Sequence, residues 1–419
     1  MARREVAFIG AVIAVGLLAG AAGAATITLL DFVEHLTYHY RFGTLLDGVT
    51  GAGPIRRVVG PMVGAALAGL GWWLLRRRRE VPAVSDAVTR PGPLPRLAMT
   101  ADAALQTLLV GSGASLGREN APRQFAVALG DAALSRWSLT ARDRTILLGC
   151  AAGAGLAAVY SVPAGGALFA LRVVLRTWEP RAVVTALLTS GLAVAAASPV
   201  THDRPELHWP DSQLSFLLTG VAVLIAPLAL AVGSAFSAVM NAARARAIGS
   251  SWLLIPALAA AGLLVGVCSH WLPELPGNGA SVLVVSLRSG LTLASAAALV
   301  MLKPLLTALF LRAGGGGGLL TPALATGAAA GAVIALGVNM FSPVHLNVPA
   351  VSLACAAGVL GITQKAPLWA ALFVWELARP PWWLLVTFTA GALATWHLRR
   401  LARRSGIQRR LAGRRARSS

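Results

Sequence analysis

Several apolar runs in this chain are as long as a membrane is thick. The first extends from Ala7 to Leu30, and further runs cover Val58–Leu75, Ala182–Pro199 and Leu214–Val239. A helix needs about 20 residues to cross a bilayer core about 30 Å thick. The N-terminal run has features of a secretory signal, but its length favours a retained span. A mean hydropathy of +0.70 excludes a soluble globule of 419 residues, so we expect an all-α polytopic membrane protein.

The basic residues fall into clusters at the ends of the apolar runs. One is Arg76–Arg79, a second is Ala242–Arg246, and a third is the tail from Arg399 to Arg417. Cytoplasmic loops of membrane proteins carry such an excess of lysine and arginine. The net charge of +20 therefore indicates topology rather than a nucleic-acid partner. We expect a multi-pass protein of the inner membrane with both termini in the cytoplasm.

Cysteine and histidine patterns give no sign of a metal or a cofactor. The three cysteines, Cys150, Cys268 and Cys355, lie in apolar stretches without ligand spacing and are expected to be free thiols. The segment Glu34–His39 places two histidines four residues apart, but its glutamate precedes both, unlike the zincin order. We interpret it as an interfacial aromatic patch and expect no enzyme active site.

Charged residues interrupt the apolar, glycine-broken segment Leu109–Phe125. It contains Arg118, Glu119 and Arg123, and Pro122 suggests the opening of a helix. Charges at membrane depth are costly and commonly mark ion pathways, and a helix N-terminus is a ready anion site. The segment therefore predicts an anion pathway with Glu119 at its mouth. The alternative is that Glu119 forms a structural ion pair with Arg118 or Arg123.

An internal repeat recurs at a distance of about two hundred residues. Cys150–Phe169 is echoed by Cys355–Phe373, and the charged segment is echoed by the glycine-rich segment Leu311–Gly331. Inverted-repeat transporters carry paired glycine-broken segments of this kind around a midplane site. We expect a first repeat, a second inverted repeat and a basic tail at residues 1–200, 201–397 and 398–419.

Two motifs resemble those of the CLC family of chloride channels and anion/proton antiporters. Gly117–Ala121 is similar to the family motif G-(K/R)-E-G-P, and Gly317–Pro322 is similar to G-G-x-F-x-P. The resemblance extends from the first span to about Trp396. It implies a CLC-like fold of two inverted repeats with helices broken at the membrane midplane, and a homodimer with one pathway per subunit. The implied dimer interface comprises Ala182–Pro199, Leu214–Val239 and Pro367–Trp396.

The resemblance also implies the site residues. Glu119 matches the gating glutamate, whose carboxylate occupies the outer anion site and leaves when it is protonated or displaced by an anion. Backbone N–H groups would bind a halide without holding it too tightly to leave. The implied anion-binding residues are Gly117, Arg118, Glu119, Asn120, Leu319 and Leu320.

Several family features are missing from this sequence. No serine lies in Arg78–Pro82, where the family loop G-S-G-I-P should fall, and the basic tail has no tyrosine. Val173 aligns with the inner proton glutamate of the antiporters, and Asn120 replaces a glycine of the gating motif. These departures favour uncoupled, channel-like conduction of an anion, with chloride expected. Antiport with protons, transport of fluoride, and a non-transporting scaffold or membrane enzyme are the alternatives.

Two further charged residues lie in apolar surroundings. Glu376 has Arg172 as its repeat counterpart, and we expect the two to pair structurally rather than to transfer protons. Lys303 precedes Pro304 and is expected to mark a membrane boundary.

Overall fold

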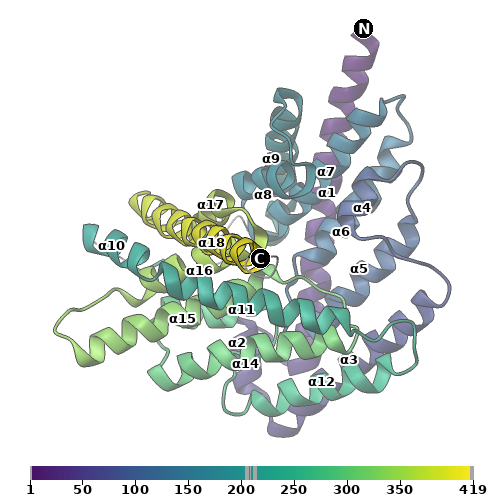
Figure 1. Ribbon diagram of the computed structural model, residues 1–419. Coiled ribbons are helices and arrows are strands. Elements are labelled where there is room, and N and C mark those ends of the chain that lie inside the picture. The colour runs from purple at the N-terminus through teal and green to yellow at the C-terminus, as the bar shows by residue number, and fades with distance from the viewer. Residues whose placement is uncertain (1, 203–206, 208, 211–214, 416–419) are drawn as a thin grey trace.

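The computed structural model describes residues 2–202, 207, 209–210 and 215–415, and the named elements of this part of the chain are all helices (Figure 1). Its elements are α1 (Ala2–Tyr38), α2 (Leu45–Gly51), α3 (Pro54–Arg76), α4 (Val84–Thr89), α5 (Arg96–Gly111), α6 (Asn120–Leu134), α7 (Ala141–Tyr160), α8 (Pro163–Phe169), the π-helical turn η1 (Ala170–Leu175), α9 (Pro180–Thr201), α10 (Phe216–Leu224), α11 (Ala226–Ala245), α12 (Leu254–Cys268), α13 (Ala280–Leu287), α14 (Leu293–Arg312), α15 (Leu320–Phe341), α16 (Val348–Gln364), α17 (Pro367–Ala378) and α18 (Trp383–Arg415).

Six of the helices within the described ranges are long and apolar enough to cross a membrane. They are α1, α3, α9, α11, α14 and α15. Shorter apolar helices such as α8, α12, α16 and α17 lie among them. A mixture of full spans and shorter apolar helices is what the broken-helix prediction requires. The all-helical, polytopic architecture predicted from the sequence is confirmed.

Each half of the chain builds its own bundle. In the first half, α1 packs against α5, α6, α7 and α9, and this helix confirms the apolar run predicted at Ala7–Leu30. In the second half, α16 packs against α11, α15, α17 and α18. Figure 1 shows α6, α7 and α9 close to α1, and α11, α15 and α18 close to α16, whereas α12 lies beside α3 of the first half.

Small residues allow the two halves to approach closely where α3 meets α12. A Cβ at Gly262 would overlap the backbone at Pro61, and a Cβ at Gly266 would overlap the backbone at Arg57. Gly69 of α3 faces the backbone of Leu254 in the same way. Membrane helices associate through such small residues because lipid supplies no hydrophobic driving force between helices.

Equivalent breaks separate α7 from α8 and α16 from α17. Ser161 and Lys365 end the longer helices in the left-handed region, with φ of 52° and 57°. A proline then opens each following helix, at Pro163 and Pro367, where its missing N–H costs no hydrogen bond. The sequence echo between Cys150–Phe169 and Cys355–Phe373 therefore corresponds to a structural echo.

The prediction of one continuous span over Leu214–Val239 is wrong for its described part. The chain there forms two helices, α10 and α11, which meet at Ile225 and Ala226. Pro227 explains the break, because its ring removes a donor and clashes with the preceding turn. The first residue of the predicted span, Leu214, lies outside the described residues.

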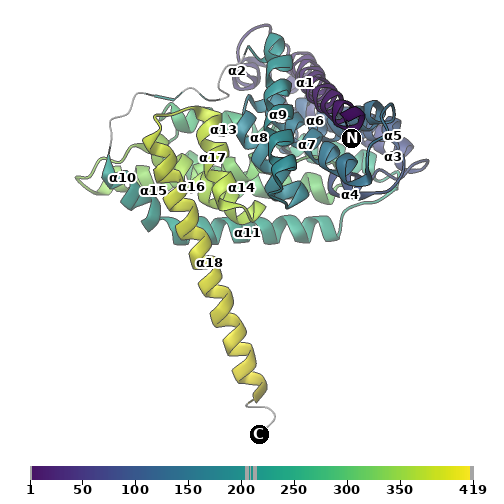
Figure 2. The same ribbon diagram turned by 90° about the horizontal axis from the view of Figure 1, so that it is seen from above.

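The C-terminal helix α18 leaves the body of the protein as one straight rod (Figure 2). Arg399 lies close to the body, where its guanidinium donates to the carbonyl oxygen of Ile362 at 2.9 Å. The helix continues from there to Arg415.

Candidate functional site at the ends of two broken helices

The first turns of α6 and α15, one from each half, meet in the interior. The preceding segments are joined by an antiparallel bridge between Gly117 and Gly318. Each of these glycines donates its N–H to the carbonyl oxygen of the other at 2.8 Å. The bridge fixes the two helix N-termini relative to one another. It also brings together the two motifs, about two hundred residues apart, on which the family resemblance rests.

The carboxylate of Glu119 lies between these helix ends. Leu320 donates its backbone N–H to Glu119 Oε1 at 2.7 Å, and the Thr321 hydroxyl donates to Oε2 at 3.2 Å. Glu119 is 1% exposed. A carboxylate held by a backbone N–H at a helix N-terminus occupies the position in which an anion would be stabilised. The Glu119 carboxylate thus lies at the N-terminus of α15.

Glycine is required on both sides of this carboxylate. A Cβ added at Gly117 or at Gly318 would overlap the carboxylate oxygens of Glu119. Either side chain would therefore push the carboxylate away from Leu320. The glycines of both motifs allow close approach here.

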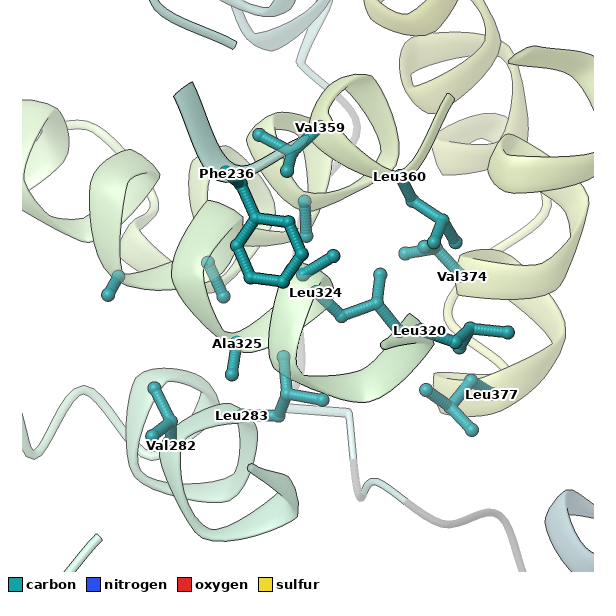
Figure 3. Close-up of a cluster of buried hydrophobic side chains, with 14 of the residues drawn as sticks. Phe236, Val282, Leu283, Leu320, Leu324, Ala325, Val359, Leu360, Val374 and Leu377 are labelled. Carbon is teal, nitrogen blue, oxygen red and sulfur yellow. The ribbon is translucent and has the colours of Figure 1, made fainter. Parts of the chain in front are cut away.

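Leu320 is held by the hydrophobic core on its other side. Its side chain is 3% exposed. Figure 3 shows it beside Leu324 of α15, with Val374 and Leu377 of α17 nearby. This packing fixes the start of α15, so the N–H of Leu320 is directed at Glu119 before any ligand arrives.

A chain of hydroxyl groups extends from Glu119 to α7. The Tyr160 hydroxyl lies 2.9 Å from Thr321 Oγ1, and Thr321 in turn donates to Glu119. Sequence reasoning missed both residues. Thr321 stands inside the glycine-proline motif and could have been noticed there, whereas nothing local marks Tyr160.

Arg118 and Arg123 do not form the ion pair with Glu119 that was the alternative prediction. Their guanidinium groups lie over the rings of Tyr160 and Phe169, at 5.0 and 4.5 Å from the ring centroids. Among the described residues, the hydrogen bonds found for the Glu119 carboxylate come from Leu320 and Thr321.

A cavity of about 500 Å³ opens beside the carboxylate. Glu119, Asn120, Leu319 and Leu320 all lie in its wall, so the structure brings most of the predicted anion-binding residues together. Its lining also includes five basic residues: Arg123, Arg244, Lys365, Arg399 and Arg403. Clustered positive charge in a cleft with low-dielectric walls raises the local concentration of anions.

The predicted pairing of Glu376 with Arg172 is wrong. Glu376 accepts the backbone N–H groups of Ala164 and Gly165 at 3.0 and 2.6 Å, at the start of α8. Two unpaired amides at a helix N-terminus are as good a partner for a carboxylate as a guanidinium. Its partner is thus the backbone of the other half, and a structural rather than proton-transferring role stays a prediction.

Lys303 does not mark a membrane boundary. It is fully buried, and its ammonium donates to the carbonyl oxygens of Leu275 and Gly277 at 2.8 Å each. It therefore ties α14 to the segment that precedes α13. A buried charge is tolerated when backbone carbonyl groups replace its water.

These features define a class of protein: a multi-pass membrane protein whose two halves meet at helix ends beside one buried carboxylate. The sequence model of the family described as voltage gated chloride channel matches residues 64–399. The chain therefore belongs to the voltage-gated chloride channel, or CLC, family. The members of this family are channels and transporters that carry anions across membranes.

Individual relatives agree with this assignment. The voltage-gated ClC-type chloride channel ClcB of Escherichia coli O9:H4 (strain HS) is 27% identical over 374 residues, covering 87% of this chain and 88% of ClcB. The structure of a slow cyanobacterial Cl⁻/H⁺ antiporter superposes with a TM-score of 0.78 at 16% identity, covering 93% of each chain. A CLC-type fluoride/proton antiporter gives a TM-score of 0.72 at 17% identity, covering 94% of this chain and 95% of that one.

Proposed function

We propose that this protein conducts chloride or another small anion by an uncoupled, channel-like mechanism gated by Glu119. The proposal rests on the position of the Glu119 carboxylate. Its Oε1 accepts the N–H of Leu320 at 2.7 Å, and Glu119 lies in the wall of a cavity lined by basic residues. An anion entering from the cavity competes with the carboxylate for the same donor. Displacement or protonation of Glu119 then opens the pathway.

The case for uncoupled conduction rests on Val173. This residue lies in the π-helical turn η1, at the position where antiporters of the family carry their inner proton glutamate. A valine cannot hold or release a proton. Without a carboxylate there, the chain lacks the group that would relay protons inward from Glu119.

Two alternatives have specific support. Proton-coupled antiport is supported by the fold, since the solved structure of the cyanobacterial relative is described as a Cl⁻/H⁺ antiporter. Fluoride as the transported ion is supported by the likeness to a fluoride/proton antiporter. Both alternatives keep Glu119 and the donors of α15 at the centre of the mechanism.

We also propose that two copies assemble with one pathway each, in the inner membrane and with cytoplasmic termini. Apolar side chains project from the proposed interface helices: Val184, Leu187 and Leu188 of α9 are each more than half exposed. So is Val386 of α18. A second subunit would shield these apolar side chains from water, and so would lipid.

The test is anion efflux from liposomes that contain the purified protein, with valinomycin present and external pH recorded. Chloride efflux without proton movement supports the proposal. Opposite proton flux that disappears in Glu119→Gln establishes antiport instead, and faster loss of fluoride than of chloride identifies fluoride as the ion. No efflux of any halide or of nitrate would contradict transport and favour a scaffold.

A further inference from the structure

A buried polar network lies next to the gating glutamate, among α3, α5 and α6. Its anchor is Asp102 of α5, whose carboxylate accepts three hydrogen bonds. The donors are Trp72 Nε1 at 2.7 Å, Gln106 Nε2 at 2.7 Å and Gln124 Nε2 at 2.9 Å. The network thus joins α3, α5 and α6.

The anchor fixes the orientation of every amide in the network. An indole nitrogen only donates, and an ionised carboxylate only accepts. Both glutamines must therefore turn their nitrogens toward Asp102. Gln106 is left with its oxygen directed away, and that oxygen accepts from Asn120 Nδ2 at 2.9 Å. The amide nitrogen of Asn120, rather than its oxygen, must then face Gln106.

This orientation leaves one N–H of Asn120 for a ligand. An asparagine amide nitrogen carries two hydrogens, and Gln106 accepts one of them. Among the described residues, Gln106 is the hydrogen-bond acceptor found for this nitrogen. The second hydrogen of Asn120 Nδ2 is therefore available. The amide hydrogens of the two glutamines are already engaged, because Gln106 also donates to Gln124 Oε1 and Gln124 also donates to the carbonyl oxygen of Met99.

Asn120 stands where two cavities meet. One is the cavity of about 500 Å³ beside Glu119, and the other, of about 660 Å³, is lined by Arg76, Arg79 and Asp102. Both cavities are lined by Asn120, Arg244 and Gly317. We call these two cavities the inner cavities. An anion that moves from the 660 Å³ cavity to Glu119 passes the place where they meet.

We propose that the side-chain amide of Asn120 donates its second N–H to the transported anion at the inner end of the pathway. The proposal rests on the proposed anion transport and names a binding residue within it. A neutral N–H stabilises a halide without the strong attraction of a full charge, which allows the ion to leave.

Asp102 acts as a positioning residue in this account. It does not contact the anion, but its acceptor-only chemistry holds Gln106 in the orientation that turns Asn120 Nδ2 toward the place where the inner cavities meet. The Asp102→Asn variant would replace an acceptor with an amide that can also donate. Gln106 and Asn120 could then adopt either orientation, and the donor would face the anion only part of the time.

The experiment measures chloride binding by titration calorimetry and chloride efflux from liposomes, for matched pairs of variants. Asn120→Ser and Asn120→Ala differ by one hydroxyl donor. We expect the serine variant to stay within about threefold of the wild-type affinity and the alanine variant to lose about tenfold, the usual effect of one hydrogen bond to a charged ligand. Asn120→Asp places an acceptor at the site and should lose more, and Asp102→Asn should lose about threefold.

The control is Asn339→Asp, which makes the same chemical change on α15. Asn339 forms hydrogen bonds with the backbone of Leu346 and lines neither of the two inner cavities. The chloride affinity and efflux of this variant should therefore match the wild type. Thermal unfolding in detergent confirms that each variant is folded. Equal affinities for the serine and alanine variants, both like the wild type, would overturn the role of Asn120 and leave the proposed function standing. A wild type that neither binds nor releases any halide would overturn both.

Discussion

Two buried glutamates, one in each half, show how similar local chemistry can serve different ends. Glu119 accepts one backbone N–H from Leu320 and a hydroxyl from Thr321, and it faces a cavity of about 500 Å³. Glu376 accepts two backbone N–H groups, from Ala164 and Gly165, and lines neither inner cavity. Both carboxylates satisfy the open end of a helix that belongs to the other half of the chain.

The difference lies in what can replace each carboxylate. In the proposed mechanism, an anion from the basic cavity takes the place of the Glu119 carboxylate on the N–H of Leu320, and the carboxylate acts as a gate. Glu376 is 9% exposed and closes the start of α8, so removing it leaves two amides without a partner. A buried carboxylate at a helix N-terminus is therefore functional only where a competitor can reach it.

The largest expected effect is that of Glu119→Gln on anion flux. The amide removes the charge that competes with the anion for Leu320, so chloride efflux should rise about tenfold near neutral pH, the effect of one lost hydrogen-bonded competitor. Liposome efflux assays at neutral pH provide the measurement. Efflux from Glu119→Gln that equals the wild-type value would contradict the gating role.

Gly318→Ala tests the same gate without changing the glutamate. The added methyl overlaps the Glu119 carboxylate, and overpacking of this kind costs about 1–3 kcal/mol. The carboxylate should leave Leu320, and efflux should approach the value of Glu119→Gln. Gly337→Ala is the matched control, because a Cβ at that position of α15, the helix that follows Gly318, meets no atom within 4 Å. Similar efflux from both alanine variants would argue against close contact between the Glu119 carboxylate and Gly318.

For Glu376→Gln the comparison predicts the reverse pattern, a loss of stability rather than of gating. An amide keeps one acceptor but turns its NH₂ group toward the second backbone N–H, so the variant should lose about 1–3 kcal/mol of stability. Thermal unfolding in detergent measures that loss. Chloride efflux per folded protein, and its pH dependence, should match the wild type. An efflux change as large as that of Glu119→Gln would remove the distinction between the two carboxylates.

The smallest expected effect is that of Tyr160→Phe. Removing this hydroxyl leaves Thr321 free to rotate, so the second hydrogen bond to Glu119 weakens while that from Leu320 remains. Loss of the neutral hydrogen bond between Tyr160 and Thr321 predicts a change of about two- to fivefold in chloride efflux. Thr321→Val, which removes the hydroxyl that contacts the carboxylate, should have the larger effect of the two. The opposite order would contradict the hydroxyl chain.

Much of the fold could be predicted from the sequence because its signals are local. Span length, arginine clusters and the two glycine motifs each depend on neighbouring residues, and they indicated the polytopic class, the repeat and Glu119. The break between α10 and α11 was missed, although Pro227 is a local signal, because the surrounding run is uniformly apolar.

The missed parts of the site depend on contacts between distant segments. Tyr160 and Thr321 are 161 residues apart, and the partner of Glu376 lies more than two hundred residues away. Side-chain type suggested an arginine for Glu376, but backbone amides supplied the partner. Lys303 was misplaced for the same reason, since the carbonyl groups that hold it carry no signature in the sequence.

The central claim is that an anion replaces the Glu119 carboxylate on the N–H of Leu320. Anomalous diffraction from crystals of Glu119→Gln grown in bromide tests it most directly. The account predicts a bromide peak within hydrogen-bond distance of the Leu320 nitrogen in this variant, and weaker density there in the wild type. Bromide that is absent from that position in the variant, or equally strong there in both proteins, would contradict the account.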